Sequence, residues 1–286
     1  MANSGWSVRR ALRFPLFLLA LFVIARSCSA RVSSDSDEDA DNESTLALEK
    51  YKPEVDEGLG ASVAIVIDNS GSMEKTARGD DRPKFIVARE ALTAMLAATD
   101  SFVARQPGFP INVGLYQFAS DVAPLVPVKP YNREALRAAL ANMPPPNGGT
   151  AIGEAMDVAR ADLYRAGTFR KYILVVTDGE NTEGRSPRRM AREIASRSEG
   201  AVRLYFVAFD IDAEKFAFLR DVRGEVLGAS NGDALRTSLD EIYRGKILAE
   251  AVDAGETLPA AQADSDSAAV RGDSASPSKP SRNREP

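Results

Sequence analysis

Three short polar stretches carry side chains whose types could bind a metal ion. The first stretch is Asp68-x-Ser70-x-Ser72, which directly follows an apolar run. The second presents Thr150 after two glycines, and the third places Asp178 after another apolar run. Two carboxylates and three hydroxyls are hard oxygen donors, which suit Mg²⁺ first and Mn²⁺ second. Because two carboxylates leave a divalent cation undersaturated, we expect an open position for water or for an incoming carboxylate.

Each of these residues also has a purely structural explanation. Asp, Asn and Ser break strands and form turns through side-chain-to-backbone hydrogen bonds, and Thr150 could simply cap a helix. Asn69 is expected on the solvent side or behind the metal ligands. Glu180 and Asn181 could shape the rim of a site, although turn formation explains them equally well. Only an arrangement that brings the three stretches together favours metal binding over turns.

The overall composition excludes several functional classes. The chain has 286 residues, 44% of them apolar, which is enough for a substantial core. Its formal charge of -5 provides no basic field for nucleic acid, so no nucleic-acid partner is expected. Histidine is absent, which removes the Ser-His-Asp and Cys-His arrangements and histidine-based zinc sites. The single cysteine, Cys28, cannot form an intramolecular disulfide.

The first thirty residues have the pattern of an export signal. Arginines precede an apolar run at 14–25, and small residues follow it. The run is shorter than the roughly 20 residues of a membrane span, so a permanent anchor is less favoured. Two processing outcomes remain open: cleavage after Ala30, or lipid attachment at Cys28, against which Arg26 counts. We therefore expect an exported protein, in the periplasm or at the cell surface, whose membrane contact runs only through residues 1–30.

The rest of the chain divides into one domain between two polar segments. Residues 31–57 are acidic and serine-rich, and residues 251–286 have a similar polar composition. Neither segment contains enough apolar residues to offset its ordering entropy, so both are expected to be solvated and disordered. The compact domain is therefore predicted at 58–250.

Strand and helix patterns alternate within this domain and predict a doubly wound α/β fold. Five apolar segments are the expected strands of a parallel sheet: 61–67, 111–118, 171–176, 202–209 and 225–227. Helical spacing of apolar residues fills the intervals, with Asn132, Ser186 and Asp212 as expected caps. The segment 121–128 follows its predecessor too closely for a crossover and contains two prolines, so it is expected to be an antiparallel edge strand.

The predicted architecture is thus a mostly parallel six-stranded sheet with helices on both faces. In such sheets, ligands bind outside the carboxyl ends of the strands, where the winding direction reverses. Asp68 and Asp178 directly follow two of the predicted strands, and Thr150 lies at the start of a helix. We therefore expect the three polar stretches to converge at one edge of the sheet.

This combination resembles the von Willebrand factor type A domain with its metal-ion-dependent adhesion site. The resemblance covers residues 58–250 and rests on "DNSGS" from Asp68, "GGTAIGEAM" around Thr150 and "VVTDG" around Asp178. The wording of these motifs is more similar to bacterial members than to animal adhesion receptors.

The resemblance implies a role for each residue of the motif. It implies that Ser70, Ser72 and Thr150 bind Mg²⁺ directly or nearly so, and that Asp68 and Asp178 act largely through bound waters. It also implies that a glutamate or aspartate from a partner protein completes the coordination shell. The leading hypothesis is an exported, non-enzymatic module that uses Mg²⁺ to bind an acidic residue of a protein partner in adhesion or assembly at the cell envelope.

Two other functions remain as alternatives. A Mg²⁺-dependent phosphotransferase or hydrolase, similar to the haloacid dehalogenase group, would need a second acidic residue where Ser70 stands, and no general base accompanies the site. A subunit of a larger envelope assembly, or one that works with an ATPase, is the third hypothesis. An exported location disfavours a cytoplasmic motor.

The tripeptide Arg-Gly-Asp occurs twice, at 78–80 and at 271–273. Some adhesion domains of this family recognise that tripeptide. Chance is the favoured explanation, because both copies lie in polar segments rich in these residues. A weaker hypothesis is that the tail offers Asp273 to the metal site of the same or a neighbouring molecule.

Overall fold

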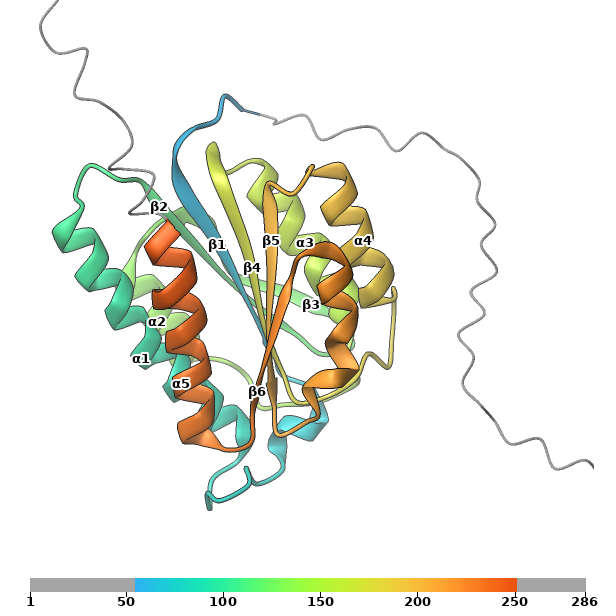
Figure 1. The fold of residues 1–286 in the computed structure, drawn as a ribbon. Coiled ribbons are helices and arrows are strands. Elements are labelled where there is room, and N and C mark those ends of the chain that lie inside the picture. Colours follow the sequence, from blue (N-terminus) through green and yellow to red (C-terminus); the bar gives the residue numbers. More distant parts are fainter. Residues whose placement is uncertain (1–54, 251–286) are drawn as a thin grey trace, which may run out of the picture. The chain divides into compact units, whose positions relative to one another are not determined.

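The computed structural model describes residues 55–250 and shows a central sheet between two layers of helices (Figure 1). The expected export signal with Cys28, nearly all of the acidic segment, and the polar tail with its Arg-Gly-Asp copy lie outside the described residues. Among residues 55–250, no helix is both long enough and apolar enough to span a bilayer.

The sheet confirms the predicted fold class. Its spatial order is β3-β2-β1-β4-β5-β6, and β3 pairs antiparallel with β2 whereas the other neighbours pair parallel. The expected edge strand is thus antiparallel, as its two prolines indicated. The strands are β1 (Gly58–Asp68), β2 (Ile111–Phe118), β3 (Val122–Pro130), β4 (Thr168–Thr177), β5 (Val202–Phe209) and β6 (Glu225–Ala229).

Three helices begin at the caps that the sequence predicted. The side chains of Asn132, Ser186 and Asp212 accept hydrogen bonds from backbone N–H groups two or three residues on. The segment that Asp212 caps is a 3₁₀ helix instead of an α-helix. The helices are η1 (Gly71–Glu74), α1 (Lys84–Arg105), α2 (Arg133–Ala141), α3 (Ile152–Tyr164), α4 (Pro187–Arg197), η2 (Ala213–Val222), α5 (Gly232–Ile242) and η3 (Tyr243–Leu248), the last with π-helical hydrogen bonding.

Alternate residues of the central strand supply two separate cores. Ile65 and Ile67 face the layer formed by α1, α2 and α5, whereas Ala64 and Val66 face α3, α4 and η2. Successive strand side chains point to opposite faces, so a strand covered on both sides must be apolar throughout. All four residues are at most 1% exposed, which explains the uninterrupted apolar run that predicted this strand.

The winding direction reverses between β1 and β4, at the centre of the sheet. From β1 the chain first builds outward through β2 and β3, and it then returns to build β4, β5 and β6 on the other side. The carboxyl ends of β1, β4 and β5 share one edge, at the lower end in Figure 1. Loops at this point diverge to opposite faces, which leaves the crevice where ligands bind in such sheets.

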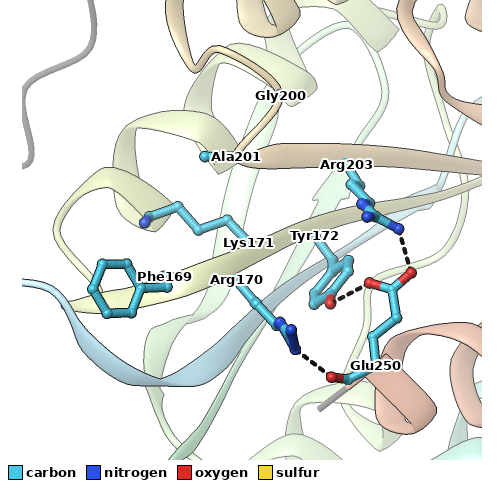
Figure 2. A pocket seen from close by; sticks show the side chains of 8 residues that line it. All are labelled: Phe169, Arg170, Lys171, Tyr172, Gly200, Ala201, Arg203 and Glu250. Carbon is cyan, nitrogen blue, oxygen red and sulfur yellow. Dashed lines mark hydrogen bonds and ion pairs between the residues drawn. The ribbon is translucent and has the colours of Figure 1, made fainter. Parts of the chain in front are cut away.

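The opposite edge of the sheet holds a cavity of ≈ 270 Å³ between the starts of β4 and β5 (Figure 2). Glu250 lines it, and its carboxylate accepts hydrogen bonds from Tyr172 Oη (2.8 Å) and from Arg203. Lys171 is fully buried there, and its ammonium donates to the Glu57 carboxylate and to the Thr168 carbonyl. The two carboxylates at this amino-terminal edge, Glu57 and Glu250, are therefore each held by a cationic side chain.

Candidate functional site

The candidate site begins where β1 ends, and Asp68 organises the turn. Its Oδ1 accepts a hydrogen bond from Ser70 N (2.8 Å), and its Oδ2 accepts one from Thr177 Oγ1 (2.6 Å). Asp68 is fully buried, and within residues 55–250 no lysine or arginine forms an ion pair with it. A buried carboxylate held only by neutral donors is a costly arrangement, which indicates that the position serves more than the fold.

Two of the three stretches are in direct contact through side-chain oxygens. Ser70 Oγ lies 3.0 Å from Ser72 Oγ, and Ser72 Oγ donates to Asp178 Oδ1 at 2.6 Å. The glycine that follows Asp178 marks the meeting point with the third stretch. A methyl group added at Gly179 would lie 3.5 Å from Thr150 Oγ1 and 3.8 Å from Ser72 Oγ. The sequence-predicted residues are thus brought together at one end of β1 and β4.

Thr150 lies two residues before α3, and the cap of that helix is Ala151. Its backbone is clamped on both sides, because Thr150 N donates to Thr182 Oγ1 (2.9 Å) and its carbonyl accepts from Thr182 N (2.9 Å). The capping explanation for Thr150 is therefore wrong. The loop that follows β4, which also carries Asp178, holds the threonine in place.

Asn69 is buried, being 2% exposed, which corrects the solvent-side expectation for this residue. Its Nδ2 donates to the Pro144 carbonyl (3.2 Å), and its own carbonyl accepts from Asn147 N (3.0 Å). A further backbone bond joins Gly71 N to the Gly148 carbonyl (3.1 Å). Asn69 thus connects the turn after β1 to the glycine-rich loop that presents Thr150.

The two expected rim residues have different roles. Glu180 is exposed and pairs with Lys215 at 2.6 Å. Asn181 accepts a long hydrogen bond from Gly153 N (3.4 Å) and donates to the Glu183 carbonyl (2.9 Å), so it joins the loop after β4 to the start of α3. Glu180 lies at the surface, whereas Asn181 stabilises the loops behind it.

The site contains two charged residues that the sequence patterns did not single out, Lys84 and Asp210. Lys84 Nζ lies 3.0 Å from Asp178 Oδ2 and 3.0 Å from Asp210 Oδ2. Asp210 directly follows β5, as Asp178 follows β4, and this shared position was the one signal that could have found it. Lys84 carried no such signal, because the first residue of a helix gives no apolar spacing to read.

Burial and hydrogen bonding shift two pKa values at the site. Desolvation by burial raises the pKa of Asp68 to about 6, although the hydrogen bonds from Ser70 and Thr177 partly offset it. Burial works to lower the pKa of the Lys84 ammonium, but its hydrogen bonds and ion pairs with Asp178 and Asp210 more than compensate, and the net shift is upward. Lys84 is therefore a cation, and ionised Asp68 is in a poorly compensated environment.

The first Arg-Gly-Asp copy lies in the loop that precedes α1, and both of its charges are engaged. Arg78 Nε lies 3.3 Å from Asp210 Oδ1, and Asp80 accepts hydrogen bonds from Arg82 Nε (2.9 Å) and Arg82 Nη2 (2.6 Å). The Arg82 contacts lower the pKa of Asp80 to about 2. Gly79 adopts a positive φ of 73°, which fits a turn.

The donor set fits a hard divalent cation. Its oxygens come from two carboxylates and three hydroxyls, which are the ligand types that Mg²⁺ accepts. Among the described residues, no three acidic or thiol side chains gather as a cluster, so a cation here would depend on hydroxyls as well as carboxylates. Asp68 supplies the strongest reason, because a cation would compensate a buried carboxylate that lacks a charged partner.

Comparison with known proteins places this fold in a family. The profile of the von Willebrand factor type A domain matches residues 62–236. A protein of Treponema pallidum, described as uncharacterized, is 28% identical over 204 residues, which make up 64% of this chain and 33% of that protein. The chain therefore spans about a third of the length of that relative.

Solved structures share the architecture at low sequence identity. The PilB minor pilin from Streptococcus sanguinis has a TM-score of 0.55 at 14% identity, over 68% of this chain and 63% of that chain. BatB from Bacteroides thetaiotaomicron has a TM-score of 0.50 at 21% identity, over 67% and 100%. A von Willebrand factor type A structure from Catenulispora acidiphila has a TM-score of 0.51 at 17% identity, over 65% and 42%. With its sheet order and a profile match over more than half of its length, the chain belongs to the von Willebrand factor type A domain family.

Proposed function

We propose that this protein is a binding module that holds Mg²⁺ with Asp68, Ser70, Ser72, Thr150 and Asp178 and then binds an acidic residue of a protein partner. The observation that carries the proposal is the contact chain from Ser70 Oγ to Ser72 Oγ (3.0 Å) and on to Asp178 Oδ1 (2.6 Å). Side chains of the first and third stretches, 106 residues apart, touch at the edge where such sheets bind ligands.

The five proposed ligands are of two kinds, neutral hydroxyls and charged carboxylates. Ser70, Ser72 and Thr150 are neutral donors that can ligate a cation without cancelling its charge, and Asp68 and Asp178 supply two negative charges behind them. The cation supplies a Lewis-acidic position that an incoming carboxylate can occupy. Mn²⁺ has similar ligand preferences and should substitute.

A binding role is favoured over catalysis by what surrounds these oxygens. Asp68 would be the nucleophile of a phosphotransferase, but both of its oxygens accept hydrogen bonds, from Ser70 N and Thr177 Oγ1. The residue two positions on is Ser70, which cannot act as the second acid of such a site. The chain also has no histidine to serve as a general base near neutral pH.

The proposal includes export and a bacterial-type setting. Residues 1–30 would direct export, with cleavage after Ala30 or lipid attachment at Cys28, and 58–250 would form the binding domain between the polar segments 31–57 and 251–286. Among the structures that share the fold are a minor pilin and a pilus adhesin, SpaC from Lactobacillus rhamnosus. That two pilus proteins share the fold supports a periplasmic or cell-surface setting, in adhesion or as a subunit of an envelope assembly.

Calorimetric titration of the full chain with Mg²⁺ and Mn²⁺ tests the site directly. We expect Asp68→Asn and Thr150→Ala to weaken binding at least about tenfold. The matched control is Asp100→Asn, because Asp100 is a partly buried carboxylate that pairs with Tyr131 and Arg133 near the end of α1. Equal affinities in all four proteins would refute a cation site at these residues.

A metal-dependent pull-down from the native envelope tests the partner chemistry. Wild-type protein should recover partners with Mg²⁺ and lose them with a chelator, and Asp68→Asn should lose them in both conditions. Partners recovered equally with and without metal would contradict binding through the cation. Replacing acidic residues of a recovered partner by amides should abolish its recovery.

A further inference from the structure

Among residues 55–250, Lys84 is the one buried cation that contacts the candidate site. It is the first residue of α1, its side chain is 8% exposed, and its ammonium lies between carboxylates that follow two neighbouring strands. Lysine is rarely buried unless it is paired, and this one has two acidic partners. The contact is therefore a built part of this edge of the sheet.

The two carboxylate oxygens of Asp178 have different hydrogen-bond partners. Asp178 Oδ2 accepts from Lys84 Nζ at 3.0 Å, whereas Asp178 Oδ1 accepts from Ser72 Oγ at 2.6 Å. The carboxylate is thereby fixed with one oxygen toward the hydroxyl donors and the other turned away. Lys84 thereby occupies one lone-pair direction of Oδ2 and competes with a cation for that oxygen.

The ammonium also sets the charge of the site. Asp68 and Asp178 carry two negative charges, and Lys84 cancels one of them. The remaining pair, Asp210 and Arg78, is balanced, because Arg78 Nε lies 3.3 Å from Asp210. A divalent cation added to one net negative charge leaves the site with one net positive charge, which a carboxylate ligand would neutralise.

We propose that Lys84 is a positioning residue that holds Asp178 by one oxygen and keeps the cation-loaded site net positive, so that the site selects an anionic ligand. This role rests on the function proposed above. The positive charge of Lys84 weakens binding of the cation alone. The same charge strengthens binding of a carboxylate to the site that already holds the cation. Binding free energies are linked reciprocally. If the bound cation increases the affinity for a carboxylate by some factor, the carboxylate must increase the affinity for the cation by the same factor.

Three variants of the full chain separate position from charge. Lys84→Met removes the ammonium and should tighten Mn²⁺ binding at least about fivefold, since a positive charge near the cation is lost. Lys84→Met with Asp210→Asn has the wild-type net charge but releases Asp178 Oδ2. Lys75→Met is the matched control, because Lys75 is exposed and its carbonyl accepts the backbone N–H of Lys84 (2.9 Å).

We expect the double variant to bind Mn²⁺ at least about threefold more tightly than wild type, and Lys75→Met to stay within about twofold. Excess acetate, corrected for its own complex with Mn²⁺, should tighten Mn²⁺ binding in wild type and do so less in Lys84→Met. Far-ultraviolet circular dichroism checks folding. If Lys84→Met fails to fold, the double variant carries the test, because it also removes the repulsion between Asp178 and Asp210.

Several outcomes would overturn the role of Lys84. The first is an unchanged Mn²⁺ affinity in both Lys84 variants. The second is an equal gain of Mn²⁺ affinity in Lys75→Met. The third is a double variant that binds Mn²⁺ with the wild-type affinity. If wild type binds Mn²⁺ and Asp68→Asn does not, the proposed function stands even when the role of Lys84 fails. If neither wild type nor the Lys84 variants bind Mn²⁺, both proposals fail.

Discussion

The two edges of the sheet each bury a lysine, but they compensate its charge differently. At the amino-terminal edge, the Lys171 ammonium contacts the Glu57 carboxylate and a backbone carbonyl. At the candidate site, Lys84 is shared by Asp178 and Asp210, while buried Asp68 is held by neutral donors. At the first edge each carboxylate has a cationic partner, whereas at the second the buried Asp68 carboxylate has only neutral donors.

This difference separates a structural charge from one that can serve binding. A buried ion pair with matched partners mainly avoids the penalty of an isolated charge. A buried carboxylate whose pKa is raised by desolvation, as for Asp68, costs stability when it is ionised, and a cation bound beside it would offset part of that cost. The contrast can be tested with changes at either edge.

The largest expected effect is on stability, from Lys171→Met at the amino-terminal edge. The substitution leaves the Glu57 carboxylate without the buried ammonium, and breaking such a pair costs about 3–5 kcal/mol. Urea denaturation measures the loss, and calorimetry of the folded fraction should give wild-type Mn²⁺ affinity. A change in Mn²⁺ affinity would show that the two edges are coupled.

The next effect is a pH dependence of the metal-free protein. Burial raises the pKa of Asp68 from 3.8 to about 6, so between these values the unfolded state has lost a proton that the folded state keeps. Stability should therefore fall as pH rises through this window, by about 3 kcal/mol from this group. Urea denaturation at several pH values in a chelator measures it, and Asp68→Asn should lack the step. The same slope in that variant would contradict the assignment.

Gly153→Ala should disturb the site edge through packing. An added Cβ would lie 2.1 Å from the Arg185 carbonyl oxygen, so α3 and the loop after β4 must separate. Such overpacking costs about 1–3 kcal/mol, and Mn²⁺ binding should weaken because Thr150 lies three residues earlier. Thermal denaturation and calorimetry check both effects. Gly245→Ala is the control, because a Cβ there meets no atom within 4 Å.

The smallest expected effect is that of Tyr172→Phe at the amino-terminal edge. It removes the hydroxyl that donates to Glu250 Oε2 at 2.8 Å, while Arg203 still holds the other carboxylate oxygen (Figure 2). The loss should be about 1 kcal/mol in urea denaturation, with no effect on Mn²⁺ affinity. If Tyr172→Phe lowered the free energy of unfolding by more than Lys171→Met does, the hydroxyl contact would matter more than the ion pair, which would contradict this prediction.

The fold was predictable because strands buried on both faces must be apolar throughout. β1, β2, β4 and β5 each contain such a run, and the prolines of β3 marked it as an edge. The convergence of Asp68, Ser72 and Asp178 was also predictable, because the carboxyl ends of parallel strands lie at the same edge of a sheet. The start of β1 at Gly58 was less visible, because its first residues are exposed.

The rest of the site depends on tertiary contacts that no local pattern encodes. Lys84 contacts Asp178 across 94 positions of the sequence, and a backbone hydrogen bond from Lys84 to the Lys75 carbonyl fixes the start of α1 at this edge. Asn69 looked like a turn residue, yet its burial results from the loop at Pro144 folding over it. Such residues are set by the approach of segments 70 or more positions apart in the sequence.

The chain enters β1 at Gly58 and leaves at Glu250, both at the edge opposite Asp68 (Figure 1). Any surface to which the domain is fixed through either end would therefore face away from the candidate site. For biosensor work, a tag placed before residue 55 or after residue 250 should leave the edge that carries Asp68 facing the solution. Coupling through surface amines would lose that orientation.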